Sequence, residues 1–138
     1  MLRRVFAFWL TSVLIVAVVF AWNAWVASNL EPDFGDAFGN FGTILAILAV
    51  LTIPVAVCHG IVSRFFRRTL AQASNRSVLI LSALAAALFV GFFFLIAPLS
   101  LDIPVKPLLL PCALGVLSTL CVYVAAGLVR GRNRVRAA

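Results

Sequence analysis

Four long apolar runs dominate the sequence, approximately Val5–Ser28, Gly42–Ser63, Val78–Leu99 and Pro107–Val129. None of the 11 basic and four acidic residues falls within these runs. About 20 apolar residues allow a helix to cross the hydrocarbon core of a bilayer, which is about 30 Å thick. The sequence therefore predicts an all-helical, integral membrane protein in which four spans form one bundle of two helical hairpins, a single domain over residues 1–138.

Composition excludes a water-soluble fold. The chain is 64% hydrophobic and 11% charged, and its mean hydropathy is +1.18. Soluble domains are about 45–50% apolar and about 25% charged. A chain of this length leaves roughly 30% of its unfolded surface exposed after folding, so this much apolar surface has to be solvated by lipid.

The arginines predict the orientation of the spans, because basic residues near span ends are retained in the cytoplasm. All ten arginines lie before the first run, between the second and third, or after the fourth. The two opposite loops carry only one basic residue, Lys106, together with all four acids. We therefore expect a bacterial-type inner-membrane protein with both termini in the cytoplasm and a basic cytoplasmic tail over residues 130–138.

The first run could be mistaken for a secretory signal, since Arg3 and Arg4 precede it. Its apolar stretch exceeds 20 residues, whereas the apolar region of a cleaved signal has about 7–15. The bulky Trp25 also occupies a position of the candidate cleavage site where a small residue is needed. We expect this segment to remain as the first span.

The formal charge of +7 and the pI near 11.1 do not indicate nucleic-acid binding. The basic residues cluster beside the spans, without the interleaved aromatic residues or the soluble domain that present such a surface. The expected partners are membrane lipids and other membrane proteins or further copies of this chain. Arginines near a membrane surface each attract anionic lipid by about 1 kcal/mol.

Small residues four positions apart predict the contact faces of the helices, because they allow backbones to approach closely within lipid. Such stripes occur in the second, third and fourth runs. Pro54 predicts a kink in the second run, because it removes a backbone donor. The predicted packing residues are Thr52, Ala56 and Gly60, then Ala83, Ala87 and Gly91, then Gly115 and Thr119.

His59 is the only histidine and lies one turn from the arginine-rich end of the second run. Seven residues separate it from Thr52, close to two full helical turns, so it shares the small-residue face and should point into the bundle. Two interpretations remain open. His59 is either a hydrogen-bonded structural residue, which we favour, or a group for proton handling, ligand binding or metal contact.

Aromatic residues near both ends of the first run are typical of membrane-interface belts. Trp22 and Trp25 flank Asn23 at the outer end, and Phe8 and Trp9 lie toward the N-terminus. We interpret all of them as anchors. Asn23 is also kept as a candidate functional polar residue.

The segment EPDFGDAFGNF, residues 31–41, holds three of the four acids. As a helix it would place Asp33 and Asp36 on one face and its phenylalanines on another, although Gly35 and Gly39 weaken a helix. An amphipathic cap lying along the outer interface is the favoured interpretation. The alternative is a mouth that attracts cations or docks a partner.

Residues for chemistry are few, so we predict no catalytic residues, no cofactor and no metal site. The acids lack the spacing of a calcium loop, and Cys112 and Cys121 are too far apart along one helix for a disulfide. The spans contain no carboxylate of the kind that coupled transporters use. We expect a non-catalytic accessory, assembly or scaffold subunit that acts through helix contacts; the alternative is a small oligomeric channel or exporter.

Overall fold

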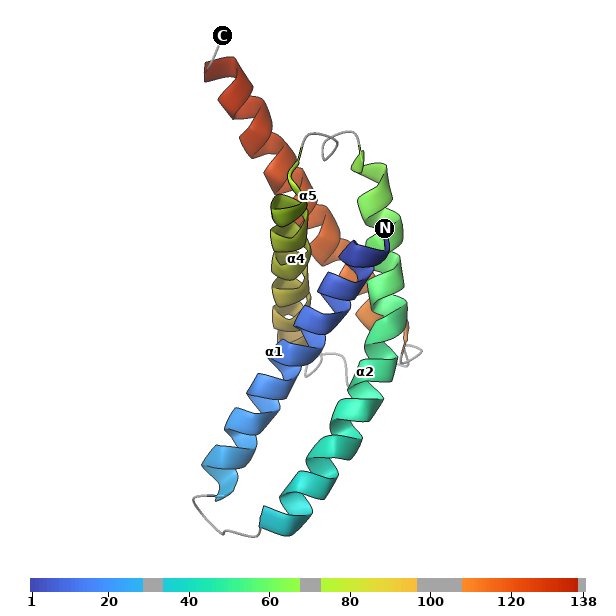
Figure 1. The fold of residues 1–138 in the computed structure, drawn as a ribbon, viewed down its shortest axis with the longest axis vertical. Coiled ribbons are helices and arrows are strands. Elements are labelled where there is room, and N and C mark those ends of the chain that lie inside the picture. The colour runs from blue at the N-terminus through green and yellow to red at the C-terminus, as the bar shows by residue number, and fades with distance from the viewer. Residues whose placement is uncertain (29–33, 68–72, 97–107, 137–138) are drawn as a thin grey trace.

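The computed structural model describes residues 1–28, 34–67, 73–96 and 108–136. It contains four helices, α1 (Leu2–Ser28), α2 (Phe34–Phe65), α4 (Asn75–Ile96) and α5 (Leu109–Arg136), and no strand in these ranges (Figure 1). Each helix includes an apolar stretch long enough to cross a membrane. The predicted all-helical fold with four candidate spans is therefore confirmed over the described part of the chain.

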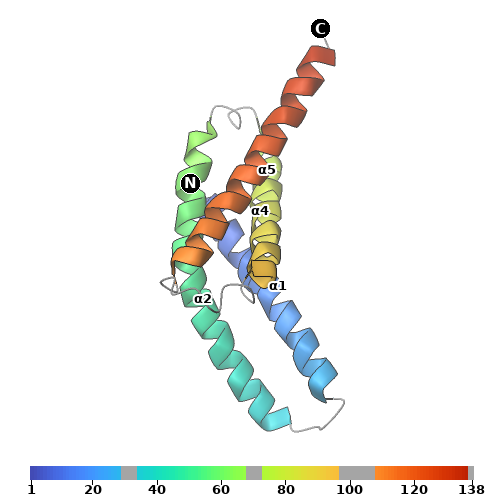
Figure 2. The ribbon, with the colours of Figure 1, turned by 180° about the vertical axis from the view of Figure 1, so that it is seen from behind.

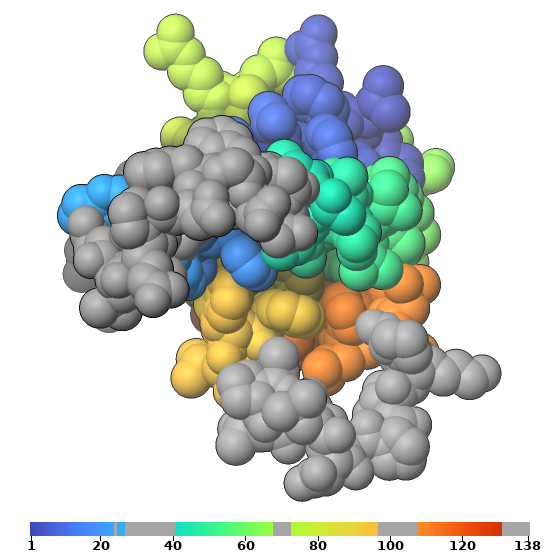
Figure 3. Space-filling model, turned by 90° about the horizontal axis from the view of Figure 1, so that it is seen from below, coloured from blue at the N-terminus to red at the C-terminus, as the bar shows by residue number. Residues whose placement is uncertain are grey.

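The helices pack side by side in the order α1, α2, α5, α4 around the bundle. Contacts join α1 to α2, α2 to α5, α5 to α4 and α4 to α1, and the front and rear views agree with this order (Figures 1 and 2). The view from below shows α5 beside α2 and α4 (Figure 3). Helices α2 and α4 consequently occupy opposite corners, so a side chain that joins them must pass through the centre.

The core lies toward the arginine-rich ends of α1 and α2. Buried side chains of α1 stop at Val16, and those of α2 start at Thr52. The other halves of α1 and α2 extend past the ends of α4 and α5 (Figure 1), and none of their described side chains between residues 17 and 51 is buried. The buried apolar residues are Phe8, Val16, Val55, Ala56, Ala85, Ala86, Phe89, Val90 and Leu114.

Three helices are longer than the apolar runs alone predict. Helix α1 begins at Leu2, α5 continues to Arg136, and α2 begins at Phe34, so most of the acidic segment forms its first turns. The interpretation of residues 31–41 as a separate interfacial cap is wrong from Phe34 onward. Extending an existing helix avoids the cost of nucleation, which offsets the roughly 1 kcal/mol that each of Gly35 and Gly39 costs.

Helix α2 continues through Pro54. The carbonyl oxygen of Ala49, in the turn before this proline, accepts hydrogen bonds from Trp9 Nε1 at 2.9 Å and from Thr52 Oγ1 at 3.0 Å. Thr52 Oγ1 also lies 2.9 Å from the carbonyl oxygen of Leu48. Pro54 lacks the N–H that would bond to the carbonyl oxygen of Val50, four residues earlier. Trp9 and Thr52 bond to the two carbonyl groups just before that one, so they fix the turn that precedes the proline without replacing the lost bond.

Candidate functional site

His59 lies at the centre of the bundle and is completely buried. Its imidazole stacks on the ring of Phe8 from α1, with centroids 4.5 Å apart and planes 18° apart. The helical position of His59 places it on the same face of α2 as Thr52 and Val55, which are also buried. His59 therefore points into the bundle, as its helical phase predicts.

Both ring nitrogens of His59 have hydroxyl partners on other helices. Nδ1 lies 3.0 Å from Thr119 Oγ1 on α5, and Nε2 lies 3.4 Å from Ser82 Oγ on α4. Together with the Phe8 stack, the imidazole contacts all three other helices. Because α2 and α4 are diagonal neighbours, the bond to Ser82 crosses the bundle axis.

The two hydroxyl groups also donate to their own helices. Thr119 Oγ1 lies 2.6 Å from the carbonyl oxygen of Gly115, and Ser82 Oγ lies 3.0 Å from that of Val78. A hydroxyl has one hydrogen and a neutral imidazole has one N–H. In the neutral site, therefore, one hydroxyl accepts from His59, while the other must turn its hydrogen from the backbone toward the second ring nitrogen. The two tautomers of His59 differ in which hydroxyl is released from its backbone.

Tyr123 of α5 extends this cluster. Its ring centroid lies 5.9 Å from that of His59 and 5.6 Å from that of Phe66. Its buried hydroxyl lies near that of Ser82 but makes no hydrogen bond of good geometry to any described residue. A buried hydroxyl without a partner costs stability, so this group is the least satisfied member of the site.

Two glycines allow the helices that carry the site to approach closely. A Cβ atom on Gly115 would lie 2.5 Å from Val55 Cγ1, and one on Gly60 would lie 2.5 Å from Val5 Cγ2. Gly115 thus sets the α2–α5 contact one turn from the His59–Thr119 bond. Gly60, adjacent to His59, sets the α1–α2 contact.

The predicted packing residues separate into two groups. Thr52, Ala56, Gly60, Gly115 and Thr119 are all buried at helix contacts. The predicted face of α4 does not pack inside the described bundle: Ala87 and Gly91 are exposed, Ala83 is only half-buried, and nothing lies within 4 Å of a Cβ built on Gly91. The buried face of α4 is instead formed by Ser82, Ala85, Ala86, Phe89 and Val90.

The other candidate polar residues are not brought to His59. Asn23 is exposed and lies 15 residues beyond Phe8, about 22 Å along α1. Trp22 and Trp25 beside it are exposed and contact each other, with centroids 5.4 Å apart. Asp33 and the side chain of Asp36 lie outside the described residues.

Sequence reasoning missed Ser82 and misassigned Phe8. Phe8 was expected in an interfacial belt, but it is completely buried against His59. The signal was available in its helical phase, because Phe8, Ser12 and Val16 are four residues apart and all buried. Ser82 likewise interrupts an apolar run, where a hydroxyl has to be turned away from lipid.

The site contains no arrangement of metal ligands. Over the described residues, no three side chains of the His, Cys, Asp or Glu type come together, and Cys58, Cys112 and Cys121 are free thiols. No protein-family model matches the chain, and neither a curated protein nor a solved structure matches it. Any functional assignment therefore depends on the geometry of this bundle.

Proposed function

We propose that this protein is a non-catalytic accessory, assembly or scaffold subunit of a bacterial-type inner membrane, with both termini in the cytoplasm. It acts through contacts between its transmembrane helices and those of other membrane proteins or of further copies of itself. The observation that carries this proposal is the half of the α1–α2 hairpin that extends past α4 and α5. Its described residues from 17 to 51 include no buried side chain.

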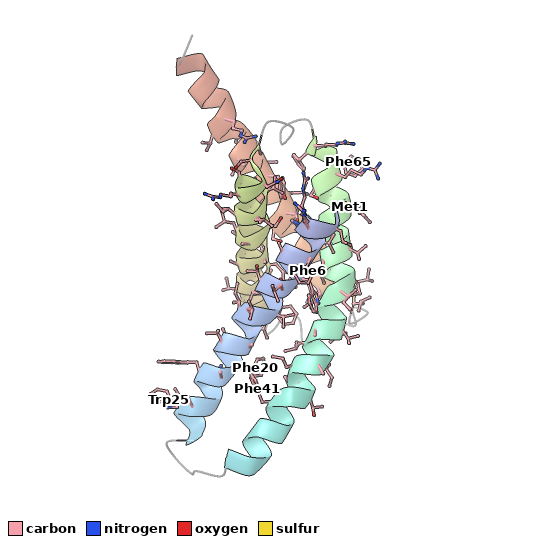
Figure 4. All side chains as sticks on the ribbon, in the orientation of Figure 1. Met1, Phe6, Phe20, Trp25, Phe41 and Phe65 are labelled. Atoms are coloured by element: carbon pink, nitrogen blue, oxygen red, sulfur yellow. The ribbon has the colours of Figure 1, made fainter. Side chains whose placement is uncertain are left out.

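This half of the hairpin remains apolar enough to lie in a membrane. The apolar stretches Leu2–Asn23 and Phe41–Phe65 both extend into it, and Val18 and Val50 are 67% and 65% exposed. Phe20 and Phe41 lie in the lower part of the hairpin (Figure 4). We name the exposed face of residues 17–26 and 41–51 the hairpin surface.

The hairpin surface has the features that promote helix association in lipid. Ala21, Gly42 and Ala46 are exposed, and small residues allow another helix backbone to approach closely. The exposed amide of Asn23 adds a group that can hydrogen-bond across helices. Leucine and valine alone would not favour a partner over lipid, whereas these small and polar residues do.

The buried histidine supports a structural role for the other half of the molecule. Its partners tie α2 to α1, α4 and α5, which holds the hairpin in a fixed orientation. Toward the outer side of the cluster, Val16, Phe89 and Leu114 fill the interior with apolar side chains. Buried polar side chains reach outward only as far as Ser12 on α1 and Thr52 on α2 within the described residues. A polar path enclosed by this single chain would therefore end at that level.

The oligomeric state tests the proposal. Native membranes would be extracted into polymer nanodiscs and the mass of the particle measured for the wild type and two double variants. Ile47→Trp with Val50→Trp adds bulk to the hairpin surface, and Leu120→Trp with Val124→Trp adds the same bulk to the exposed face of α5. We expect only the hairpin pair to release a single 14.9 kDa chain from a larger assembly. A wild-type protein that is already a single chain would contradict the proposal.

The alternative, a small oligomeric channel or exporter, is separated by flux. Purified protein in liposomes would be assayed for passage of ions and small solutes, with His59→Ala and Asn23→Ala as variants. Transport would be favoured if the protein produced a flux and if either substitution abolished it. The scaffold proposal expects the same permeability as protein-free liposomes.

A further inference from the structure

A polar cavity of about 380 Å³ opens where the first turn of α1 meets the last turns of α2. It is lined by Met1, Arg4, Gly60, Ser63, Arg64 and Arg67. Figure 4 shows Met1 beside α2, below Phe65. Three guanidinium groups therefore share one recess at the arginine-rich end of the bundle.

No carboxylate lies beside the arginines of this cavity within the part of the chain that the structure describes. All four acids of the chain lie in residues 31–36 and at 102, and the whole of α1, about 40 Å long, separates Arg4 from Glu31. The half-buried side chain of Arg4 donates from Nη1 to the carbonyl oxygen of Ser63 at 3.4 Å, which is a neutral partner. The concentrated positive charge favours an anion from outside the chain.

The depth of the cavity identifies the kind of anion. The apolar stretch of α1 starts at Leu2 and that of α2 ends at Phe65, so the cavity lies where hydrocarbon gives way to headgroups. The anions concentrated at that depth are phospholipid phosphates. Arginine binds phosphate oxygens in a bidentate, charge-assisted geometry.

An apolar groove of about 550 Å³ lies next to the cavity and is lined by residues that include Arg3, Val5, Phe6, Trp9 and Ile53. On α2 the two hollows follow one face, since Ile53, Ala56, Gly60, Ser63 and Arg67 are three or four residues apart. Val5 lies against Gly60 at the boundary between them. The groove therefore runs from the charged cavity toward the membrane interior.

We propose that this end of the α1–α2 crossing is a binding site for one anionic phospholipid. Arg4, Arg64 and Arg67 hold its phosphate, and an acyl chain lies along the groove beside Phe6, Trp9 and Ile53. The charged cavity of this site is at the opposite end of α1 and α2 from the hairpin surface, and the groove ends near that surface at Trp9 and Ile53. It does not depend on the proposed scaffold role.

Lipid titration followed by native mass spectrometry tests this site on the full chain in neutral detergent. The probes are phosphatidylglycerol and, as the uncharged comparison, phosphatidylcholine with the same acyl chains. The double variant Arg4→Gln with Arg64→Gln should weaken phosphatidylglycerol binding by about thirtyfold. This is the effect of losing two arginines that each contribute roughly 1 kcal/mol to the binding free energy. The control Arg76→Gln with Arg132→Gln removes the same charge outside the cavity and should stay within about threefold of wild type.

Inorganic phosphate in excess over the lipid distinguishes the two sources of the anion. We expect it to leave phosphatidylglycerol bound, because it cannot use the groove; displacement would assign the cavity to free oxyanions and overturn the proposal. Equal binding of both lipids, or equal loss in the control variant, would also overturn it. Circular dichroism checks the fold of each variant. If the double variant fails to fold, the single variant Arg67→Gln at an exposed position replaces it, and its affinity for phosphatidylglycerol should fall about fivefold.

Discussion

The imidazole of His59 and the ring of Phe8 lie parallel to within 18°, with 4.5 Å between their centroids. This stack joins α2 to α1 at the level where His59 also reaches Thr119 of α5 and Ser82 of α4. Lipid provides little hydrophobic force between helices. A hydrogen-bonded side chain that contacts every helix therefore fixes how the four helices align.

Replacing His59 should measure what this contact contributes. His59→Ala removes the stack and both hydrogen bonds and leaves a cavity, so we expect a loss of about 2–4 kcal/mol in the free energy of unfolding. His59→Phe keeps an aromatic ring against Phe8 and should lose less, about 1–2 kcal/mol. Steric trapping in bicelles measures both, with the exposed Cys121→Ala as control. A His59→Ala variant as stable as this control would contradict the structural role.

Replacing a glycine by alanine should have opposite effects on stability at Gly115 of α5 and at Gly91 of α4. Gly115→Ala places a Cβ atom 2.5 Å from Val55 Cγ1 and should destabilise the bundle by about 1–3 kcal/mol. Gly91→Ala meets nothing within 4 Å and should be neutral or stabilising by up to about 1 kcal/mol, because alanine favours the helix. The same unfolding assay compares them. The reverse order would show that α2 and α5 do not meet at Gly115.

The hydroxyls of Tyr123 and Thr119 provide a second matched pair. Tyr123→Phe removes a buried hydroxyl that has no partner among the described residues, so stability should be unchanged or rise by up to about 1 kcal/mol. Thr119→Val removes the partner of His59 Nδ1 and should cost about 1–2 kcal/mol. If Tyr123→Phe proved the more damaging change, its hydroxyl would be bonded after all, with the nearby hydroxyl of Ser82 as the partner to test next.

The orientation of the chain can be tested by labelling single cysteines in a variant whose three native cysteines are replaced by serine. From the arginine distribution, Ala138→Cys should react with a membrane-impermeant maleimide only in inverted vesicles. Asp33→Cys should react in intact cells. Labelling of Ala138→Cys in intact cells would reverse the proposed topology.

The four helices were predictable because lipid burial requires long uncharged runs, and Pro54 does not end α2. The inward position of His59 followed from its helical phase relative to Thr52. The hydrogen-bond partners of His59 could not be predicted in this way, because the order of the helices around the bundle decides which hydroxyl groups face it. The face of α4 that packs inside the bundle was not found for a related reason: in an alanine-rich helix, small residues occur on several faces, and Ser82 marks the buried one.

The extent of α2 shows a different limit. Hydropathy locates the part of a helix that lies in lipid, but not the turns that continue beyond it, so the start at Phe34 was missed. The stagger of α1 and α2 against α4 and α5 was likewise not predictable, since it depends on where Val55 of α2 meets Gly115 of α5. That stagger creates the hairpin surface.

Site-specific photo-crosslinking in native membranes tests the role of the hairpin surface most directly. Benzoyl-phenylalanine would replace Val50 on the hairpin surface or, as the control, Val124 on α5; these residues are 65% and 48% exposed. The proposal predicts a discrete protein adduct from position 50, identified by mass spectrometry as one partner or a second copy, and only lipid adducts from position 124. Lipid adducts alone from both positions would contradict it.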